Sequence, residues 1–406
     1  MNVLHLTTMP LWPVNNGARL RTWNLLKHVA AKHTGTLLAM YTHADAPSEN
    51  DREQMASLVP DVRLIPRPTH KAFRIANGIR SLATGDAFTY LNFRFSAFAQ
   101  AIEKILEEKD FDLVHCHQNH TLLYRHLFAD KAILLDSHGL GATQWRAYGG
   151  NKGNNLLVRA FCLYQARLLD RLEGDMNNGC DAVLTCSELE MKSLQEKCPD
   201  VPYFFIPNGV DTEYFSSPPV EEEPFSLVYT SAFDYVPNAD AVVQFVQKTL
   251  PIILRKYPET KLYLVGKDPV PAVKALASSH VIVTGTVDDV RPDVAKAQVF
   301  VVPLRVGQGT RLKVVEAMSM SKAIVSTSVG AEGIQYTHDE NILIADTPQE
   351  MAEAVGHLFE DSGRRQRLGR AARELAVQRY DWGLWGTAMD DAYAMALDRW
   401  KRRVIP

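Results

Sequence analysis

Short apolar runs rich in β-branched and leucine residues alternate along the chain with segments of helical periodicity. In the first half, these runs lie at residues 3–6, 36–41, 113–117, 132–135 and 182–185. In the second half, they lie at residues 226–230, 261–265, 281–284, 299–303, 323–326 and 342–344. Alternation of strand and helix builds parallel sheets with right-handed crossovers and with helices on both faces. The pattern therefore predicts an α/β protein with two Rossmann-like, doubly wound parallel sheets in tandem.

Turn-forming residues separate the two series of predicted strands. The segment 202–211 contains two prolines and an Asn-Gly pair, and Pro218-Pro219 and an acidic run follow it. Such residues interrupt regular structure, so we place the domain boundary near residue 210. Open α/β sheets bind ligands beyond the carboxyl ends of their strands, which predicts a ligand site in a cleft between the two sheets. The apolar spacing from Glu350 to Trp400 predicts a helical tail.

Composition narrows the class of protein. The 44 lysines and arginines against 47 acidic residues give a net charge of −3, so nothing attracts nucleic acid at long range. The five cysteines show no C-x-x-C spacing, which favours a reducing compartment over a disulfide framework. The N-terminal segment lacks the basic and apolar regions of a signal peptide, and no apolar run approaches the ~20 residues of a membrane span. We therefore expect a cytoplasmic protein that is either free or peripheral at the inner face of the membrane.

A glycine-containing loop joins a predicted strand to a predicted helix in the second half of the chain. The apolar run at 299–303 leads into the sequence Gly307-Gln308-Gly309-Thr310, and a helical pattern begins near Arg311. Unpaired N–H groups and the positive end of a helix dipole would then point at one place, which suits a diphosphate. Arg311 and Lys313 add cations there, and Glu316 could reach a pair of ribose hydroxyls. Alternatively, the glycines form only a tight turn and Arg311 pairs with Glu316 within the helix.

The whole segment 299–333 resembles the retaining, nucleotide-sugar-dependent glycosyltransferases of group 1, also called family 4, and so do other segments over nearly the whole chain. The resemblance implies a GT-B fold. An acceptor domain would comprise residues 1–207, completed by a C-terminal helix at 380–406, and a donor domain would comprise residues 208–379. It also assigns Glu316 to the nucleotide ribose. The first glutamate of the family motif is replaced here by Gln308, which keeps an acceptor oxygen but loses the charge.

The same resemblance implies further site residues. It places Arg311, Lys313, Gln308 and His138 at the reacting centre. The residues that it implies for donor binding are Gly17, Gly309, Thr310, Glu316, Thr286, Val287, Asn238 and Glu332. For the acceptor, it points to Asn16 and Arg19 in the N-terminal glycine loop, and we add His117 at a strand end.

Histidines and carboxylates elsewhere have competing interpretations. His138 follows the strand at 132–135, where it could act at the reacting centre or be a structural histidine. The cluster from His115 to His120 contains three histidines, but no ligand set of standard spacing is complete, so we expect no metal and no other cofactor. Asp110-Phe111-Asp112 precedes a strand instead of following it, which argues against a metal-binding D-x-D motif. The segment 70–82 mixes basic and apolar residues, typical either of a membrane-surface helix or of a packed helix with a solvated basic face.

These observations lead to one principal hypothesis. The chain is expected to transfer a sugar from a nucleoside diphosphate sugar to an acceptor hydroxyl with retention of anomeric configuration. The acceptor could be a small molecule, a glycan or a lipid-linked sugar, and no nucleic acid is involved. Two alternatives remain, a nucleotide-sugar 2-epimerase with the same fold and a two-lobed ligand-binding protein.

Overall fold

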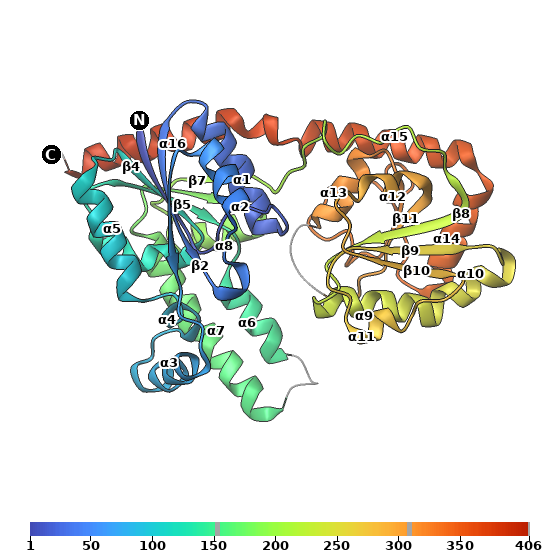
Figure 1. Cartoon of the computed structure of the whole chain (residues 1–406), viewed down its shortest axis with the longest axis horizontal. Coiled ribbons are helices and arrows are strands. Elements are labelled where there is room, and N and C mark those ends of the chain that lie inside the picture. The colour runs from blue at the N-terminus through green and yellow to red at the C-terminus, as the bar shows by residue number, and fades with distance from the viewer. Residues whose placement is uncertain (151–154, 307–310, 405–406) are drawn as a thin grey trace. The chain divides into compact units, whose positions relative to one another are not determined.

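The computed structural model describes residues 1–150, 155–306 and 311–404. The chain divides into two compact units, Met1–Pro207 with Trp385–Pro406 and Asn208–Leu384 (Figure 1). Residues 380–384, which the sequence analysis assigns to the first domain, thus lie in the second unit. The reason is that Val210 N donates to Tyr380 O at 2.7 Å and Trp382 N donates to Val210 O at 3.2 Å, which ties this segment to the start of the second unit.

The first unit is built on a parallel sheet with the strand order β3-β2-β1-β4-β5-β6-β7. Its strands are β1 (Asn2–Thr7), β2 (Thr34–Tyr41), β3 (Asp61–Pro66), β4 (Leu113–His117), β5 (Ala132–Ser137), β6 (Ala182–Thr185) and β7 (Tyr203–Phe205). Its helices are α1 (Gly17–Ala30), α2 (Glu49–Leu58), α3 (Lys71–Thr84), α4 (Phe88–Leu91), α5 (Ser96–Glu108), α6 (Gly141–Gly150), α7 (Leu156–Asn177), α8 (Glu188–Lys197), α16 (Gly386–Val404) and the 3-10 segments η1 (His43–Asp45) and η2 (Asn119–Leu127). The central strands β4 and β5 are buried at every position, as expected where helices cover both faces of a sheet.

The second unit is built on a smaller parallel sheet with the strand order β10-β9-β8-β11-β12-β13. Its strands are β8 (Glu223–Thr230), β9 (Lys261–Val265), β10 (Val281–Gly285), β11 (Ala297–Val302), β12 (Ala323–Ser326) and β13 (Leu343–Ile344). Its helices are α9 (Val236–Gln244), the π-helical segment η3 (Phe245–Thr249), α10 (Leu250–Lys256), α11 (Pro271–Lys274), α12 (Arg291–Lys296), α13 (Leu312–Ser319), α14 (Pro348–Glu360) and α15 (Ser362–Arg379). The 3-10 segment η4 (Trp382–Trp385) follows and leads into α16.

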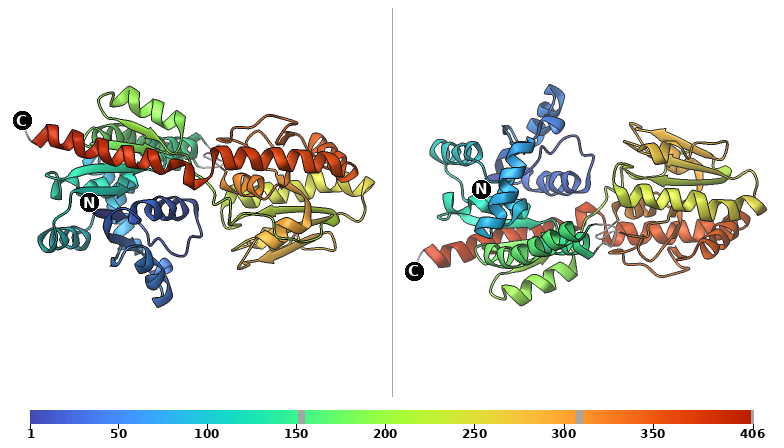
Figure 2. Two further views of the ribbon diagram at one scale, coloured as in Figure 1. Left: turned by 90° about the horizontal axis from the view of Figure 1, so that it is seen from above. Right: turned by 90° about the horizontal axis from the view of Figure 1, so that it is seen from below.

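The C-terminal helix α16 belongs to the first unit, where it packs against β5 and β6. Its apolar face, which includes Met389, Ala392, Tyr393 and Ala396, is buried. In each unit, helices lie on both faces of the sheet (Figure 2). The two parallel sheets and the C-terminal helix confirm the predicted α/β architecture. In the part of the chain that the structure describes, no helix combines the length and the apolar character that a bilayer crossing requires.

Candidate active site

Lys313 lies where the strand order of the second unit reverses. From β8 the chain continues to β9 and β10 on one side, whereas β11 leads to β12 and β13 on the other. Loops that leave two such strands diverge, which leaves room for a ligand beyond the strand ends. Helix α13, which comes after β11 in the chain, brings the Lys313 ammonium to residues in β8 and just after it.

The ammonium group of Lys313 is surrounded by uncharged oxygen atoms. Nζ donates to Tyr229 Oη at 2.8 Å, to Ser231 Oγ at 2.7 Å and to Asn238 Oδ1 at 3.1 Å. These three acceptors match the three donors of an ammonium group. Burial, together with the nearby charge of Arg311, lowers the pKa of Lys313 to about 7. The charge of Glu316 raises the pKa of Lys313 but does not outweigh burial, and none of the ion pairs among the described residues involves Lys313, so an anionic ligand could pair with this ammonium directly.

The lowered pKa of Lys313 predicts that nucleoside diphosphate binding weakens as the pH rises. Only the protonated amine attracts a diphosphate, so the dissociation constant should increase up to about tenfold per pH unit between about pH 7.5 and 9, where phosphates are already fully ionised. Lys313→Arg is the matched variant, because its guanidinium stays charged throughout this range. Calorimetry should show that the arginine variant loses most of the pH dependence. An equal pH dependence in both proteins would contradict the assignment.

Two further charged residues lie near Lys313. Arg311 directly precedes α13, and its Nη2 lies 3.7 Å from Oε2 of Glu332, so the structure places the predicted donor residue Glu332 beside Arg311. Glu316 follows Lys313 by three positions on α13, which puts both side chains on one face of the helix. Burial raises the pKa of Glu316 to about 7, while the charge of Lys313 opposes this shift. This face of α13 therefore carries two groups that could bind a ligand. The Lys313 ammonium could bind an anion, and the Glu316 carboxyl could accept a hydrogen bond from a hydroxyl group.

The other predicted donor residues have different surroundings. Asn238 is engaged within the fold, because its Oδ1 accepts from Tyr229 Oη at 3.0 Å as well as from Lys313, and its Nδ2 donates to Ala232 O at 2.9 Å. Asn238 thus holds Lys313 in place. Thr286 and Val287 directly follow β10, which is separated from β8 by β9; Thr286 is exposed and Val287 packs against the core. The predictions for Gln308, Gly309 and Thr310 lie outside the described residues.

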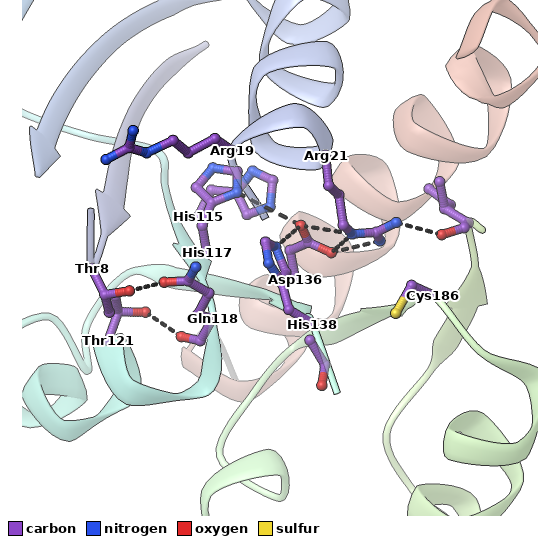
Figure 3. A network of polar contacts seen from close by, with 12 residues as sticks. Thr8, Arg19, Arg21, His115, His117, Gln118, Thr121, Asp136, His138 and Cys186 are labelled. Atoms are coloured by element: carbon purple, nitrogen blue, oxygen red, sulfur yellow. Dashed lines mark hydrogen bonds and ion pairs between the residues drawn. The ribbon is translucent and has the colours of Figure 1, made fainter. Parts of the chain in front are cut away.

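A buried ion pair lies at the carboxyl end of β5 in the first unit (Figure 3). Arg21 Nε lies 2.9 Å from Asp136 Oδ1, Arg21 Nη2 lies 2.6 Å from the same oxygen, and the two side chains are 2% and 0% exposed. Arg21 Nη1 also donates to Ile206 O at 2.6 Å. Burial acts to raise the pKa of Asp136, but the charges of Arg21 and His138 outweigh it and hold this pKa well below its usual range. Asp136 is therefore ionised in the folded protein.

The imidazole of His138 is oriented by this carboxylate. Nε2 of His138 lies 2.8 Å from Asp136 Oδ2, and the side chain is 13% exposed. An ionised carboxylate only accepts, so Nε2 carries a proton, and in the neutral form of the ring Nδ1 has the lone pair. Nδ1 has no hydrogen-bond partner in the residues that the structure describes. In the neutral ring, this buried nitrogen is an acceptor that the described residues leave without a partner, just beyond the end of β5.

One predicted acceptor residue, His117, is buried in the first sheet. His117 is 0% exposed, and its Nε2 lies 3.3 Å from Nδ1 of His5, so its side chain is covered within the fold of the first unit. The physical reason is that α16 covers this face of β4, where Tyr393 Oη lies 2.8 Å from Nδ1 of His115. Strand alternation alone could not indicate a covering helix from the far end of the chain.

The N-terminal loop residues lie at the start of α1. Asn16 caps the helix by accepting from Arg19 N at 3.0 Å, and both Asn16 and Gly17 are exposed. The Arg19 guanidinium is buried and lies 3.3 Å from Asp45 Oδ2 and 3.1 Å from Asn15 Oδ1. Asn16 and Gly17 therefore remain accessible to a ligand, whereas Arg19 is held by its own domain.

Of the residues that hold His138 and Lys313 in place, the sequence indicated only Asn238. Asp136 gave a signal, since a carboxylate inside an otherwise apolar strand needs a buried partner. Its partner Arg21 lies on the first helix, and nothing in the sequence around Arg21 indicates that it pairs with Asp136. Tyr229 in β8 and Ser231 just after it were not predicted either. A tyrosine in a predicted strand is normally interpreted as a residue of the hydrophobic core.

Comparison with known proteins agrees with this architecture. Residues 15–214 match the family model described as Glycosyltransferase Family 4, and residues 224–361 match the model described as Glycosyl transferases group 1. An uncharacterized 44.6 kDa protein in the cps region of Klebsiella pneumoniae is 20% identical over 351 residues, which are 82% of this chain and 84% of that protein.

Solved structures share the fold at low sequence identity. Sucrose-phosphate synthase from Thermosynechococcus elongatus has a TM-score of 0.69 at 17% identity, with 98% of this chain and 100% of that chain covered. HepE from Anabaena, in complex with UDP, has a TM-score of 0.65 at 14% identity, with 97% and 100% covered. The two family models meet near the boundary between the two units and together cover most of the chain. The chain therefore belongs to the group 1 and family 4 glycosyltransferases, and it has their GT-B fold.

Proposed function

We propose that this glycosyltransferase uses a nucleoside diphosphate sugar as its donor and transfers the sugar to an acceptor hydroxyl with retention of configuration. The observation that carries the proposal is the Lys313 ammonium, which lies at the switch point of the second unit, donates to three neutral oxygens and forms no ion pair among the described residues. A diphosphate would pair with this ammonium. Structures of HepE in complex with UDP and with UDP-glucose support a donor of this class.

The residues of the second unit would share the work of donor binding. Lys313 and Arg311 stabilise the negative charge that grows on the departing diphosphate, which is the interaction that accelerates the reaction most. Glu316 accepts hydrogen bonds from the ribose hydroxyls, and Thr286 and Val287 border the base. In the proposed step the acceptor oxygen bonds to the anomeric carbon as the bond to the diphosphate breaks, and the acceptor proton passes to the leaving diphosphate. The protein's own cations hold the phosphates, so we propose that the chemistry needs no divalent metal and no other cofactor.

His138 would contact a sugar hydroxyl through Nδ1, since Asp136 holds the proton on Nε2. Replacing His138 by alanine should lower kcat roughly 10- to 100-fold, the value of a hydrogen bond to a group that gains charge in the transition state. The affinity of the enzyme for the nucleoside diphosphate alone should not change, because that ligand contacts the second unit. Steady-state kinetics and calorimetry measure the two quantities. A variant with wild-type kcat would remove His138 from the reacting centre.

The direct test of the proposal is a screen of UDP, GDP and ADP by thermal shift, followed by assays with the matching nucleotide sugars. A ligand that binds only the folded protein raises its apparent stability. Product analysis with the donor alone separates the alternatives, because a 2-epimerase would return an epimerised nucleotide sugar without any acceptor. A binding protein would leave the donor intact. A transferase would release the nucleoside diphosphate and form a glycoside when acceptor is present.

We further propose a lipid-linked acceptor, reached from the cytoplasmic face of a membrane. Helix α3 exposes three aliphatic side chains, Ile75, Ile79 and Leu82, at 53%, 66% and 63%. The same helix carries three cations and no acidic residue, with Lys71, Arg74 and Arg80. Its buried positions are the polar Asn77 and Ser81, so its apolar side points away from the domain. Aliphatic and basic side chains together suit an anionic lipid surface, and the five free cysteines suit a reducing compartment.

Membrane binding through α3 predicts co-sedimentation with phosphatidylglycerol vesicles and much weaker binding to phosphatidylcholine vesicles. The double variant Ile75→Asp, Ile79→Asp should lose most of this binding, because it adds negative charge and removes apolar area. Leu189→Asp is the matched control, since Leu189 is an aliphatic residue on α8 that is even more exposed (79%) than Ile75 and Ile79. Equal loss in the control, or no loss in the double variant, would count against α3.

A further inference from the structure

Three histidines come together on one face of the first sheet. In the pairing of β1 with β4, His5 lies opposite His115, and His117 follows two positions later on the same face of β4. All three side chains are almost completely buried, at 0% to 1% exposure. We propose that His5, His115 and His117 form a binding site for a transition-metal ion of the Zn²⁺ type (Figure 3 shows His115 and His117).

The distances between the ring nitrogens fit such an ion. One nitrogen from each of the three rings lies within 4.8 Å of the others. His5 Nδ1 and His117 Nε2 are 3.3 Å apart. Two imidazole ligands of a tetrahedral zinc ion, each bound at about 2.0–2.1 Å, stand about 3.4 Å apart. Only the third nitrogen has to approach for all three to bind one ion.

The hydrogen bonding of the cluster is incomplete without a further partner. Nε2 of His115 and Nδ1 of His117 have no hydrogen-bond partner in the described part of the chain. An unsatisfied buried polar atom costs about 1–3 kcal/mol, so such atoms are uncommon in a folded protein. A metal ion would use Nε2 of His115 directly. It would also use Nε2 of His117, which leaves the other nitrogen of that ring to face Asp136.

The surroundings supply the second layer of contacts that metal-bound histidines require. His115 Nδ1 lies 2.8 Å from Tyr393 Oη, which would fix the ring with Nε2 free for the metal. His117 Nδ1 lies 3.8 Å from the ionised Asp136, and a small shift would complete the histidine–carboxylate pair typical of zinc sites.

The site differs in place and role from the proposed donor site. It lies within the first unit, whereas Lys313 and Glu316 belong to the second, and its histidines are closed to substrate. An ion there would link β1 to β4, the two strands between which the order of the first sheet reverses. It would also fix the ring next to Asp136, which orients His138. The inferred role is therefore structural.

The test begins with the wild-type enzyme, purified without a histidine tag from cells grown with added zinc and then dialysed. Elemental analysis should find about one zinc ion per chain, the value for a single site. The variant His5→Gln, His117→Gln should retain almost none, whereas the control His126→Gln, on an exposed residue, should retain all of it. Wild-type protein without bound metal, or a double variant with the full amount, would overturn the proposal.

A second measurement does not depend on the variants and therefore holds even if they misfold. Wild-type protein produced in cobalt-supplemented minimal medium should show the intense visible absorption of tetrahedral Co²⁺ bound by nitrogen ligands. The same protein should unfold at a lower temperature after the metal is removed with a chelator in mild denaturant, because a ligand bound only by the folded state stabilises it. Cobalt that is absent, or that shows only the weak absorption of octahedral Co²⁺, would refute the site.

Discussion

Replacing Lys313 by methionine should lower kcat/KM for the nucleotide sugar by about 10²–10³-fold, the cost of removing one preorganised group that stabilises charge in a transition state. Methionine keeps the length and the apolar part of the side chain. It also leaves Tyr229, Ser231 and Asn238 without their common donor, so the three oxygens can no longer hold a charge at the strand ends. Initial rates of nucleoside diphosphate release, measured over a range of donor concentrations, give this ratio directly.

A matched control shows whether the loss of kcat/KM is specific to Lys313. Lys274 is an exposed lysine in the same unit, at the end of α11, and Lys274→Met should behave as the wild type. Thermal unfolding of Lys313→Met should show a folded protein, because the substitution removes a charge that burial disfavours. Wild-type kcat/KM in Lys313→Met would show that the diphosphate binds elsewhere.

Replacing Asp136 by asparagine should destabilise the first unit by about 3–5 kcal/mol, because it leaves the buried Arg21 guanidinium without its counter-charge. Urea unfolding followed by tryptophan fluorescence suits this measurement. Five of the six tryptophans lie in the first unit, at positions 12, 23, 145, 385 and 400, so the signal reports mainly on that unit. The variant should also lower kcat, since His138 loses the carboxylate that orients its ring.

The double variant Arg21→Met, Asp136→Leu provides the control for burial. Replacing both charges with apolar residues should recover most of the stability, because the cost of the single variant comes from the unpaired charge. Asp110→Asn should have almost no effect, since the Asp110 side chain is 92% exposed in its pair with Lys131. A loss in Asp136→Asn no larger than in Asp110→Asn would show that the Arg21 pair does not support the fold.

The sequence allowed prediction of the fold because its strands are nearly continuous apolar runs. The predicted runs at 113–117 and 132–135 correspond to β4 and β5, whose complete burial leaves little ambiguity. The last predicted run, at 342–344, corresponds to the strand β13, which has only two residues. The chain returns to the first unit after the predicted residue 380, because hydrogen bonds with Val210 keep residues 380–382 in the second unit.

The candidate site was predictable only in part. Lys313, Glu316 and Arg311 follow a strand and a glycine loop, and this local order is visible in a sequence. The oxygens that bind Lys313 lie 75 to 84 positions away, and no local pattern joins them. The meeting of His5 with His115 and His117 also depends on the pairing of β1 with β4, which the order of the strands along the chain does not reveal. Contacts that depend on topology therefore required the structure.

Calorimetric titration of the wild type and of Lys313→Met with UDP, GDP and ADP measures whether the Lys313 ammonium binds a nucleoside diphosphate. At least one of these nucleoside diphosphates should bind the wild type with a dissociation constant below about 1 mM, and the variant should bind the same ligand at least tenfold more weakly. No binding of any of the three to the wild type, or equal binding to both proteins, would contradict this role of Lys313.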